Sequence, residues 1–597
     1  MSNGLEVLIV KDKNARKTAA GITVNSGITK EGEVYGLAHF TEHMLFLGSK
    51  KYPNPTKFVD YITQYSGVFN GYTDFDITAF YFSIHPDYFK KGIDIFARFF
   101  IDPLFDKQYI KKEVNSVNSE FERNIQVDYK RKEQVFRDIA NKNSHFHRFT
   151  TGNNKTLLEY TEKEGLNLRD EVSDYYQKNY RPDNMKLIIY GNEDVDYYKD
   201  IVEKSFSEMK AHDEPYEEKD TSELPFTFFN EGKFVIYKTI SQHQQLEINF
   251  LIPDIFESLP HNIGLYFKTL FNYKGRGSLV DILIKNGLGS YIYSGLRKTY
   301  KGWSIFKIRA SLTEKGIIQI PRVLFLIFKY IEYIKKLSLN KKLFYHIKRF
   351  YDIKFLFINR YHRPISFVSS MCMAFLKYSK KDLFSQHNLL YLYDSMKIRE
   401  FANHFKLKNS IILLGNRNFN NKLTKNFKYM IKQYKYNKDF KSEDPWYNTK
   451  YTKYSISDKF IDEVENDTQH PEELGFSRHF NFLRRRRRIR NISLLKSCKR
   501  NRKQCIKEFR KDRKDLTPKK IWKSKYYELW SKRDRSFMVS RINFFTKFIF
   551  KPDDLIKDPK YSILLKLHTY SIQNQLRNYI NDQRRNRNYF YILPKIK

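Results

Sequence analysis

Residues 36–48 of this sequence read Gly36-Leu37-Ala38-His39-Phe40-Thr41-Glu42-His43-Met44-Leu45-Phe46-Leu47-Gly48. If this stretch is helical, His39, Glu42 and His43 lie at positions i, i+3 and i+4, so two imidazoles and a carboxylate leave one face of a single turn. Two neutral imidazoles can bind Zn²⁺, and an adjacent carboxylate that is not a ligand can accept a proton from water at the metal. The stretch therefore predicts a candidate zinc site.

The motif alone leaves two interpretations open. Its order, H-x-x-E-H, inverts the common H-E-x-x-H signature of zinc peptidases, but a His pair on an amphipathic helix is more often a surface or core feature than a ligand pair. A catalytic zinc needs a third protein ligand. The acidic run from Glu113 to Asn124 supplies Glu113 and Glu120, seven residues apart on one helix face, so one can bind metal while the other orients the site.

The motif, followed 77 residues after His43 by Glu120, resembles the insulinase (pitrilysin) family of inverted-motif zinc metallopeptidases, of the insulin-degrading enzyme and nardilysin type. The resemblance implies one Zn²⁺ per chain, held by His39, His43 and Glu120. It implies that Glu42 is the catalytic base and that Glu113 orients the metal ligands without binding the metal itself.

A second match concerns the substrate. Asn70-Gly71-Tyr72-Thr73 resembles the Asn-Ala-Phe-Thr edge strand of this family, beside which a peptide substrate pairs as an added β-strand. Gly71 stands where Ala is usual. We expect this change to loosen the strand without removing its hydrogen bonds, which come from the backbone.

An internal repeat indicates a tandem duplication. Residues 174–192 and 401–416 each read as a helix end, a polar turn, an apolar strand and a Gly-Asn stop, and the two Gly-Asn pairs lie 224 residues apart. Only the first copy carries the His and Glu set. The resemblance implies an α+β fold of tandem homologous domains, each a mostly antiparallel sheet with helices packed on one face.

The repeat and the composition predict five segments. These are a zinc-bearing peptidase domain (1–211), a linker (212–226), a second homologous domain without a metal site (227–455), a basic, disordered insert (456–515) and a partial third domain (516–597). Within the first domain we expect a half-buried strand at 17–27, a strand at 78–84 and one long helix from Lys107 to about Lys142.

Charge and cysteine content bound the class of protein. The net charge is +41, but residues 1–150 hold 21 Lys and Arg against 18 Asp and Glu, so the zinc-bearing part is nearly neutral. Three cysteines, with no secretory signal at the N-terminus, favour a reducing, cytoplasmic location. No apolar run is long enough to span a bilayer.

Much of the excess charge lies between Arg484 and Lys514, which hold 16 Lys and Arg against two acids. Such a block is usually a solvated, disordered segment, although it can bind nucleic acid or anionic surfaces or act as a nuclear-import signal. Aromatic residues are sparse in it, which disfavours single-strand binding by base stacking. We therefore do not expect nucleic acid to be the main partner.

These observations predict a zinc-dependent metalloendopeptidase that hydrolyses extended peptides or unfolded polypeptides with metal-activated water. In single-chain members of the family the second half supplies an Arg and a Tyr that hold the substrate carbonyl. The resemblance implies that this sequence is C-terminally truncated before that half. The alternative is a catalytically weak or silent peptide-binding subunit. The peptidase could act alone, or a partner chain or self-association could supply the missing half, and the silent subunit would need a partner chain.

Overall fold

A computed structural model describes most of residues 1–466 and a few residues beyond. The gaps within residues 1–466 are 215, 217–222, 227–231, 243, 255–261, 301, 357–362, 381, 386–387, 418–426 and 433–441. Beyond residue 466 the described residues are 519–523, 528–531, 560, 563–564, 567 and 571. The basic stretch from Arg484 to Lys514 lies outside the described residues, as do Cys498 and Cys505.

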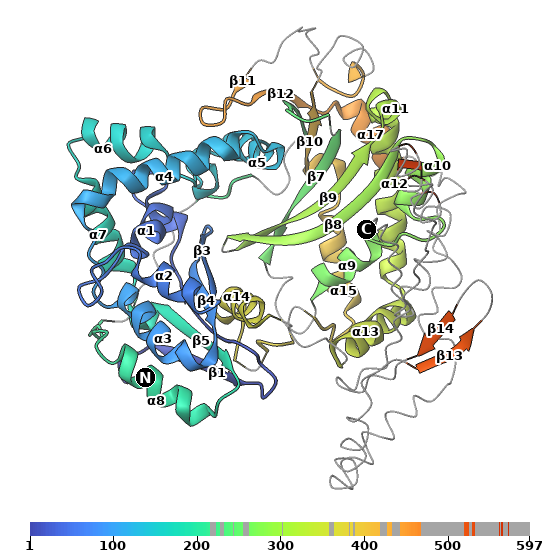
Figure 1. Ribbon diagram of the computed structural model, residues 1–597. Helices are drawn as coiled ribbons and strands as arrows, with labels where there is room; N and C mark the ends of the chain where they lie inside the picture. The colour runs from blue at the N-terminus through green and yellow to red at the C-terminus, as the bar shows by residue number, and fades with distance from the viewer. Residues whose placement is uncertain are drawn as a thin grey trace. The chain divides into compact units, whose positions relative to one another are not determined.

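The first sheet has five strands in the order β1-β5-β2-β4-β3 (Figure 1). Its strands are β1 (Glu6–Lys11), β2 (Thr18–Val24), β3 (Val68–Thr73), β4 (Thr78–Ile84) and β5 (Met185–Gly191). β1 and β5 pair in parallel, and the remaining pairs are antiparallel. This order leaves β3 at one edge of the sheet.

The second sheet has seven strands in the order β11-β12-β6-β10-β7-β9-β8. Its strands are β6 (Lys233–Lys238), β7 (Gln245–Pro253), β8 (Gly289–Tyr300), β9 (Trp303–Leu312), β10 (Ser410–Asn416), β11 (Ser442–Glu443) and β12 (Lys450–Ser455). Without β11 and β12 the order matches that of the first sheet strand for strand, and β10 pairs with β6 in parallel as β5 does with β1. The predicted α+β fold of repeated, mostly antiparallel sheets is confirmed.

Helices connect the strands in both repeats. Those of the first repeat are α1 (Leu37–Leu45), α2 (Lys57–Gln64), α3 (Phe89–Ala97), α4 (Lys107–Ile125), α5 (Asp128–Asp138), α6 (Tyr160–Lys163), α7 (Leu168–Asn179) and α8 (Val195–Phe206). Those that follow are α9 (Ile263–Phe271), α10 (Leu279–Lys285), α11 (Glu314–Ile318), α12 (Ile320–Ser338), α13 (Lys341–Leu356), α14 (Pro364–Phe375), α15 (Ser395–Asn403) and α17 (Asp458–Asn466).

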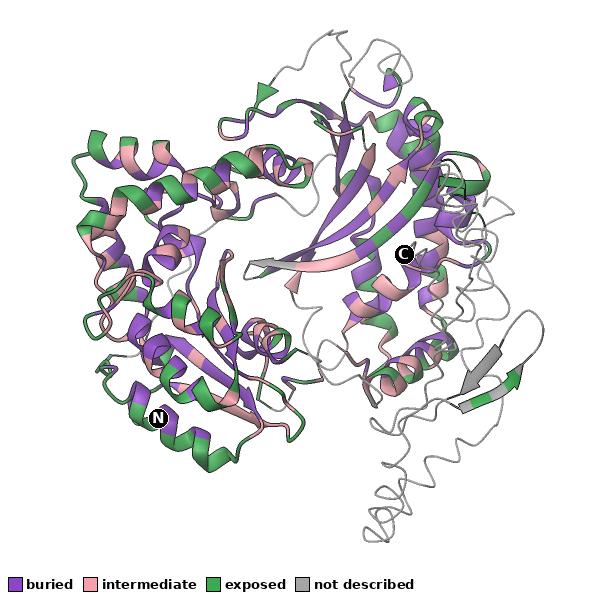
Figure 2. Cartoon of the chain, in the orientation of Figure 1, coloured by how far each residue is buried: buried purple, intermediate pink, exposed green. Residues whose placement is uncertain are grey.

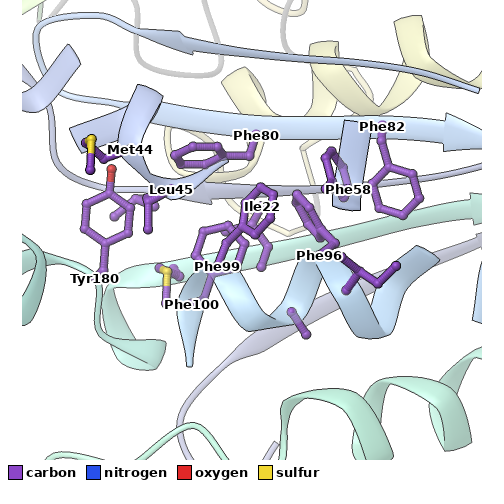
Figure 3. Packing of buried hydrophobic residues seen from close by; sticks show 14 of the residues in the cluster. Ile22, Met44, Leu45, Phe58, Phe80, Phe82, Phe96, Phe99, Phe100 and Tyr180 are labelled. Carbon is purple, nitrogen blue, oxygen red and sulfur yellow. The ribbon is translucent and has the colours of Figure 1, made fainter. Parts of the chain in front are cut away.

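A phenylalanine-rich core fixes α1 on the first sheet. Met44 and Leu45 of α1 pack in one cluster with Phe80 of β4 and with Phe99 and Phe100, which follow α3 (Figure 3). Burying a side chain of this size contributes about 1.5–3 kcal/mol. The apolar residues of α1 thus face the core, so its His and Glu side chains are left for the opposite side.

The long helix expected from Lys107 to about Lys142 is two helices, α4 and α5. The chain leaves the helical conformation at Val127, whose φ of −107° and ψ of 108° are extended. β-branched Val loses side-chain freedom in a helix, and Asp128 at the first position of α5 suits the positive end of a new helix. α4 keeps a mostly exposed outer face (Figure 2), and its buried residues are Val114, Val117 and Phe121.

The strand expected to be half-buried at 17–27 is buried along its whole length as β2. Its second face is covered by α14, which comes from the sequence of the second repeat and packs on β2, β4 and β5. Gly21 of β2 leaves room for this contact, because a Cβ there would lie 2.6 Å from Val368 and 2.9 Å from the Cys372 sulfur. Cys372 is therefore a packing residue of α14.

The chain divides into two compact units. The first comprises Met1–Tyr273, Leu279–Lys341 and Arg360–Leu474, and the second comprises Lys274–Ser278, Lys342–Asn359 and Gly475–Lys597. Both large sheets belong to the first unit. The second unit contains an antiparallel hairpin of β13 (Lys519–Lys523) and β14 (Glu528–Ser531). None of the described helices is long and apolar enough to cross a membrane.

Candidate metal centre

The N-terminus of α1 is held from two sides. Gly36, just before the helix, has a φ of 86°, which favours glycine, and a Cβ at this position would lie 2.3 Å from the Gly152 Cα. The Glu31 carboxylate accepts hydrogen bonds from the Gly36 amide at 3.1 Å and the Ala38 amide at 2.8 Å. Burial raises the pKa of Glu31 to about 8. These contacts set where the first turn of α1 points its side chains.

The structure brings His39, His43 and Glu120 together. Glu120 Oε2 lies 3.8 Å from His39 Nε2 and 3.9 Å from His43 Nε2. The two imidazole centroids are 4.8 Å apart with their planes at 85°. Among the described residues, this is the only group of three or more His, Cys, Asp or Glu side chains close enough to hold a metal ion.

The Nδ1 atoms of both histidines are already bonded. His39 Nδ1 donates to the Thr151 carbonyl at 2.7 Å, and His43 Nδ1 donates to Glu113 Oε1 at 2.7 Å. These bonds leave the Nε2 atoms unprotonated and directed at Glu120, which is the arrangement that fixes ligand histidines in zinc proteins. Glu113 thus lies behind His43, where the resemblance places it.

The donor set fits zinc. Two imidazole nitrogens and one carboxylate oxygen form the three-ligand set of a catalytic zinc site. The Nε2 to Oε2 separations of 3.8 and 3.9 Å exceed hydrogen-bond length. They are close to the roughly 3.3 Å that separates two ligands, each about 2.0–2.1 Å from Zn²⁺, in a tetrahedral site. The three residues could therefore hold the ion after small shifts of their side chains.

The two histidines differ in proton affinity. Burial and the neighbouring His43 lower the pKa of His39 to about 4, so this ring is neutral at pH 7. Burial also lowers the pKa of His43, but the hydrogen bond to Glu113 and the charges of Glu42 and Glu113 outweigh it and raise the pKa overall. Metal binding requires a neutral imidazole, and His39 already supplies one.

Glu42 lies between α1 and the edge strand. Its side chain is 6% exposed, and its Oε2 accepts a hydrogen bond of 2.7 Å from Thr73 Oγ1 of β3. Burial raises the pKa of Glu42 to about 7 against the opposing effect of the Thr73 hydrogen bond. A Cβ at Gly71 would lie 2.4 Å from Glu42 Oε1, so the glycine provides the space that this carboxylate occupies.

The four residues expected to bind substrate lie in β3, at the edge of the first sheet. Side chains alternate along a strand, so Gly71 and Thr73 face Glu42 while Asn70 and Tyr72 face away. The Asn70 amide donates to the Tyr81 hydroxyl at 3.2 Å, and the Tyr72 hydroxyl contacts Met373 of α14. Pairing with a further strand would therefore use the backbone N–H and C=O groups on the outer edge of β3.

Sequence reasoning missed two contributors to this site. Thr151 acts through its carbonyl, a group that every residue carries, so no side-chain pattern could have indicated it. Glu31 lies outside the N-cap position of α1, which is Gly36, so the usual capping pattern could not have indicated it. Neither residue would hold the metal, but both position α1 or its His39.

Three family models match consecutive parts of the chain. They are "Insulinase (Peptidase family M16)" at residues 6–143, "Peptidase M16 inactive domain" at residues 167–351 and "Middle or third domain of peptidase M16" at residues 355–583. The model that matches the candidate site is thus the first. In the described residues of the second repeat no metal-binding group occurs.

Among curated relatives, the A-factor-processing enzyme of Saccharomyces cerevisiae is 31% identical over 386 residues, covering 63% of this chain and 36% of that protein. The insulin-degrading enzyme of Homo sapiens is 28% identical over 469 residues, covering 78% of this chain and 44% of that protein. The alignment thus spans less than half the length of either relative. The crystal structure of pitrilysin matches 98% of this chain and 58% of its own, with a TM-score of 0.73 and 20% identity, which indicates the same fold. The chain belongs to the insulinase family, peptidase family M16.

Proposed function

We propose that this chain is a zinc-dependent endopeptidase that hydrolyses extended peptides or unfolded polypeptides. The observation that carries the proposal is the convergence of His39 Nε2, His43 Nε2 and Glu120 Oε2, with the other nitrogen of each ring already bonded. When bound there, Zn²⁺ supplies a Lewis acid that polarises the peptide carbonyl and lowers the pKa of water toward about 7.

Glu42 is the proposed general base. Its buried carboxylate has a pKa of about 7, which suits a group that must accept a proton and then release it near neutral pH. It would take a proton from the attacking water and pass that proton to the nitrogen of the departing amine. The Thr73 hydrogen bond holds Oε2 of this carboxylate, and Oε1, which lies beside Gly71, makes no hydrogen bond to a described residue and would accept the proton.

The substrate would lie beside β3. A peptide that pairs with the backbone of this edge strand is extended and passes Gly71 and Thr73. Thr73 donates a hydrogen bond to Glu42, and Gly71 lies beside the Glu42 carboxylate. Strand pairing reads the backbone, so it accepts many sequences but excludes segments that are already folded. The proposed substrates are therefore flexible polypeptides.

The test uses the full chain, a metal analysis and an internally quenched, unstructured peptide. We expect about one zinc per chain, cleavage that stops with a chelator and returns with zinc, and loss of cleavage in Glu42→Gln with zinc retained. Glu120→Gln should lose zinc, whereas Glu122→Gln, on the exposed side of α4, should keep both zinc and activity. Cleavage that persists in Glu42→Gln or in the metal-free chain would overturn the proposal.

A second candidate function follows from the extent of the match. The alignment spans 36% and 44% of two curated relatives, so groups that complete the site could reside on a partner chain. The chain would then be a peptide-binding subunit with little activity alone. Zinc and peptide binding without cleavage, followed by cleavage on adding a partner, would favour this function over the first.

A further inference from the structure

A cavity of about 230 Å³ adjoins the candidate metal centre. Thr73 and Thr151 both line it; the first donates to Glu42, and the carbonyl of the second accepts from His39. The rest of the lining includes three residues of α5, namely Lys130, Gln134 and Arg137. A group of a peptide lying along β3 could therefore enter this cavity close to the bond that is cut.

Two cations of this cavity, Lys130 and Arg137, form no direct ion pair with a described carboxylate. In the described part of the chain, neither Lys130 nor Arg137 has a carboxylate oxygen within ion-pair distance. Arg137 makes one long hydrogen bond, 3.5 Å to the Arg148 carbonyl, and its guanidinium lies 4.7 Å from the Phe75 ring centroid. Burial, and next the charge of Arg297, lowers the pKa of Arg137 against the opposing charges of Glu133 and Asp74. A guanidinium so placed favours an incoming anion.

The two carboxylates that line the cavity are already engaged. Glu133 lies 3.1 Å from Lys307, 3.3 Å from Lys132 and 3.3 Å from Arg297. Asp74 lies 3.6 Å from Arg297. The negative charge that lines the cavity is therefore shared with other cations, so Glu133 and Asp74 offset the positive charge of Arg137 only in part.

Gln134 adds a neutral donor. Its side chain is only 4% exposed and lines the cavity, yet it makes no side-chain hydrogen bond to any described residue. Buried polar groups nearly always have a partner, so a carboxamide in this position is suited to water or to a ligand. Together the cavity offers an ammonium, a guanidinium fork and an amide N–H.

We propose that the cavity lined by Lys130, Gln134 and Arg137 binds a carboxylate of the peptide substrate and makes the chain prefer an acidic side chain, or a C-terminal carboxylate, near the cut bond. A carboxylate has two oxygens that match the two parallel N–H groups of a guanidinium, and such charge-assisted bonds are about twice as strong as neutral ones. The inference rests on the proposed peptidase function and specifies its substrate class.

The test scans one acidic position through an otherwise neutral quenched peptide. Each Glu peptide is paired with its Gln isostere, and peptides ending in a free carboxylate are paired with C-terminal amides. For wild type we expect kcat/KM to favour the carboxylate member about tenfold at one position, or at the C-terminus, which tells the two sources apart. The preference should fall toward one in Lys130→Gln and in Arg137→Gln. Lys142→Gln, an exposed cation beyond α5, should retain it.

Equal rates for all pairs, or a preference unchanged in both variants, would overturn the inference even if the chain is a peptidase. If no peptide is cut, the peptidase proposal fails separately. The same pairs are then compared by fluorescence anisotropy on the full chain. About tenfold tighter binding of the carboxylate member, lost in Lys130→Gln, would support the cavity as a carboxylate site, and equal binding would refute it. Lys130 is only partly buried, so its variant guards against a folding defect in Arg137→Gln.

Discussion

Glu247 is the residue whose replacement tests the packing of α5 on the second sheet. Its side chain is 1% exposed, and its Oε2 lies 2.5 Å from Nζ of Lys132, which is also 1% exposed. Lys307 lies 3.6 Å away, and Arg309 donates to the same carboxylate. These cations outweigh the opposing effect of burial and lower the pKa of Glu247. Glu247 thus lies among three cations, and it shares two of them, Lys132 and Lys307, with Glu133.

We expect Glu247→Gln to destabilise the protein by about 3–5 kcal/mol, the cost of breaking a buried ion pair and leaving a charge without compensation. An exposed pair would be worth only about 0–1 kcal/mol. The larger range applies because both Glu247 and Lys132 are almost fully buried. Since the folded pKa of Glu247 lies below its unfolded value, its contribution is present above the unfolded pKa and is lost as pH falls through the folded pKa.

The assay is urea unfolding of the full chain at pH 7, with the transition of the first compact unit followed separately because a chain of this size need not unfold in one step. Asp200→Asn breaks an exposed pair with Lys204 and is the matched control, with an expected cost of at most about 0.5 kcal/mol. Adding Lys132→Met to Glu247→Gln should recover part of the loss, because it removes a buried cation that has lost one of its two carboxylate partners and keeps only Glu133. A cost for Glu247→Gln no larger than that of Asp200→Asn would refute this reasoning.

Three further predictions concern the candidate site. Gly71→Ala should change the free energy of unfolding by less than about 1 kcal/mol, because only the flexible end of the Glu42 side chain must move. It should lower kcat about tenfold, because the shift disturbs the hydrogen bond between Thr73 and Glu42. Thermal unfolding and peptide cleavage measure the two effects. Glu113→Gln should weaken zinc binding about 10–100-fold in a competition titration with a chelator, because His43 loses the carboxylate that orients it, and unchanged affinity would contradict this role. Burial raises the folded pKa of Glu31 to about 8, so its contribution to stability is fully present below the unfolded pKa of 4.5 and is lost as pH rises through 8. Glu31→Gln should remove this loss, and unfolding profiles from pH 5 to pH 9 that stay parallel to those of wild type would count against it.

Local sequence predicted the elements whose signals are local. The strand expected at 78–84 is β4, Thr78–Ile84, because its apolar run is bounded by turn residues. The matching Gly-Asn stops end two strands, β5 and β10, that occupy equivalent places in the two sheets. By contrast, the helix break at Val127 was missed, because its polar and apolar pattern continues through the break and only the backbone turns.

The sequence by itself determined the chemistry of the candidate site. The spacing of His39, Glu42 and His43 places three functional groups on one turn of a helix, since helical periodicity depends only on positions along the chain. The same rule put Glu113 and Glu120 on one face of α4. It could not say which of the two meets the imidazoles, because that depends on how α4 crosses α1.

Tertiary structure decided what surrounds those groups. The Thr151 carbonyl that orients His39, the burial that raises the pKa of Glu42 and the cover of β2 by α14 all come from segments distant in sequence. The same holds for the cavity beside the site, where Arg297 from β8 pairs with both acids of the lining, Asp74 and Glu133. Residue spacing fixes which groups share a face, but the packing of remote segments fixes their solvation and their partners, and these set their reactivity.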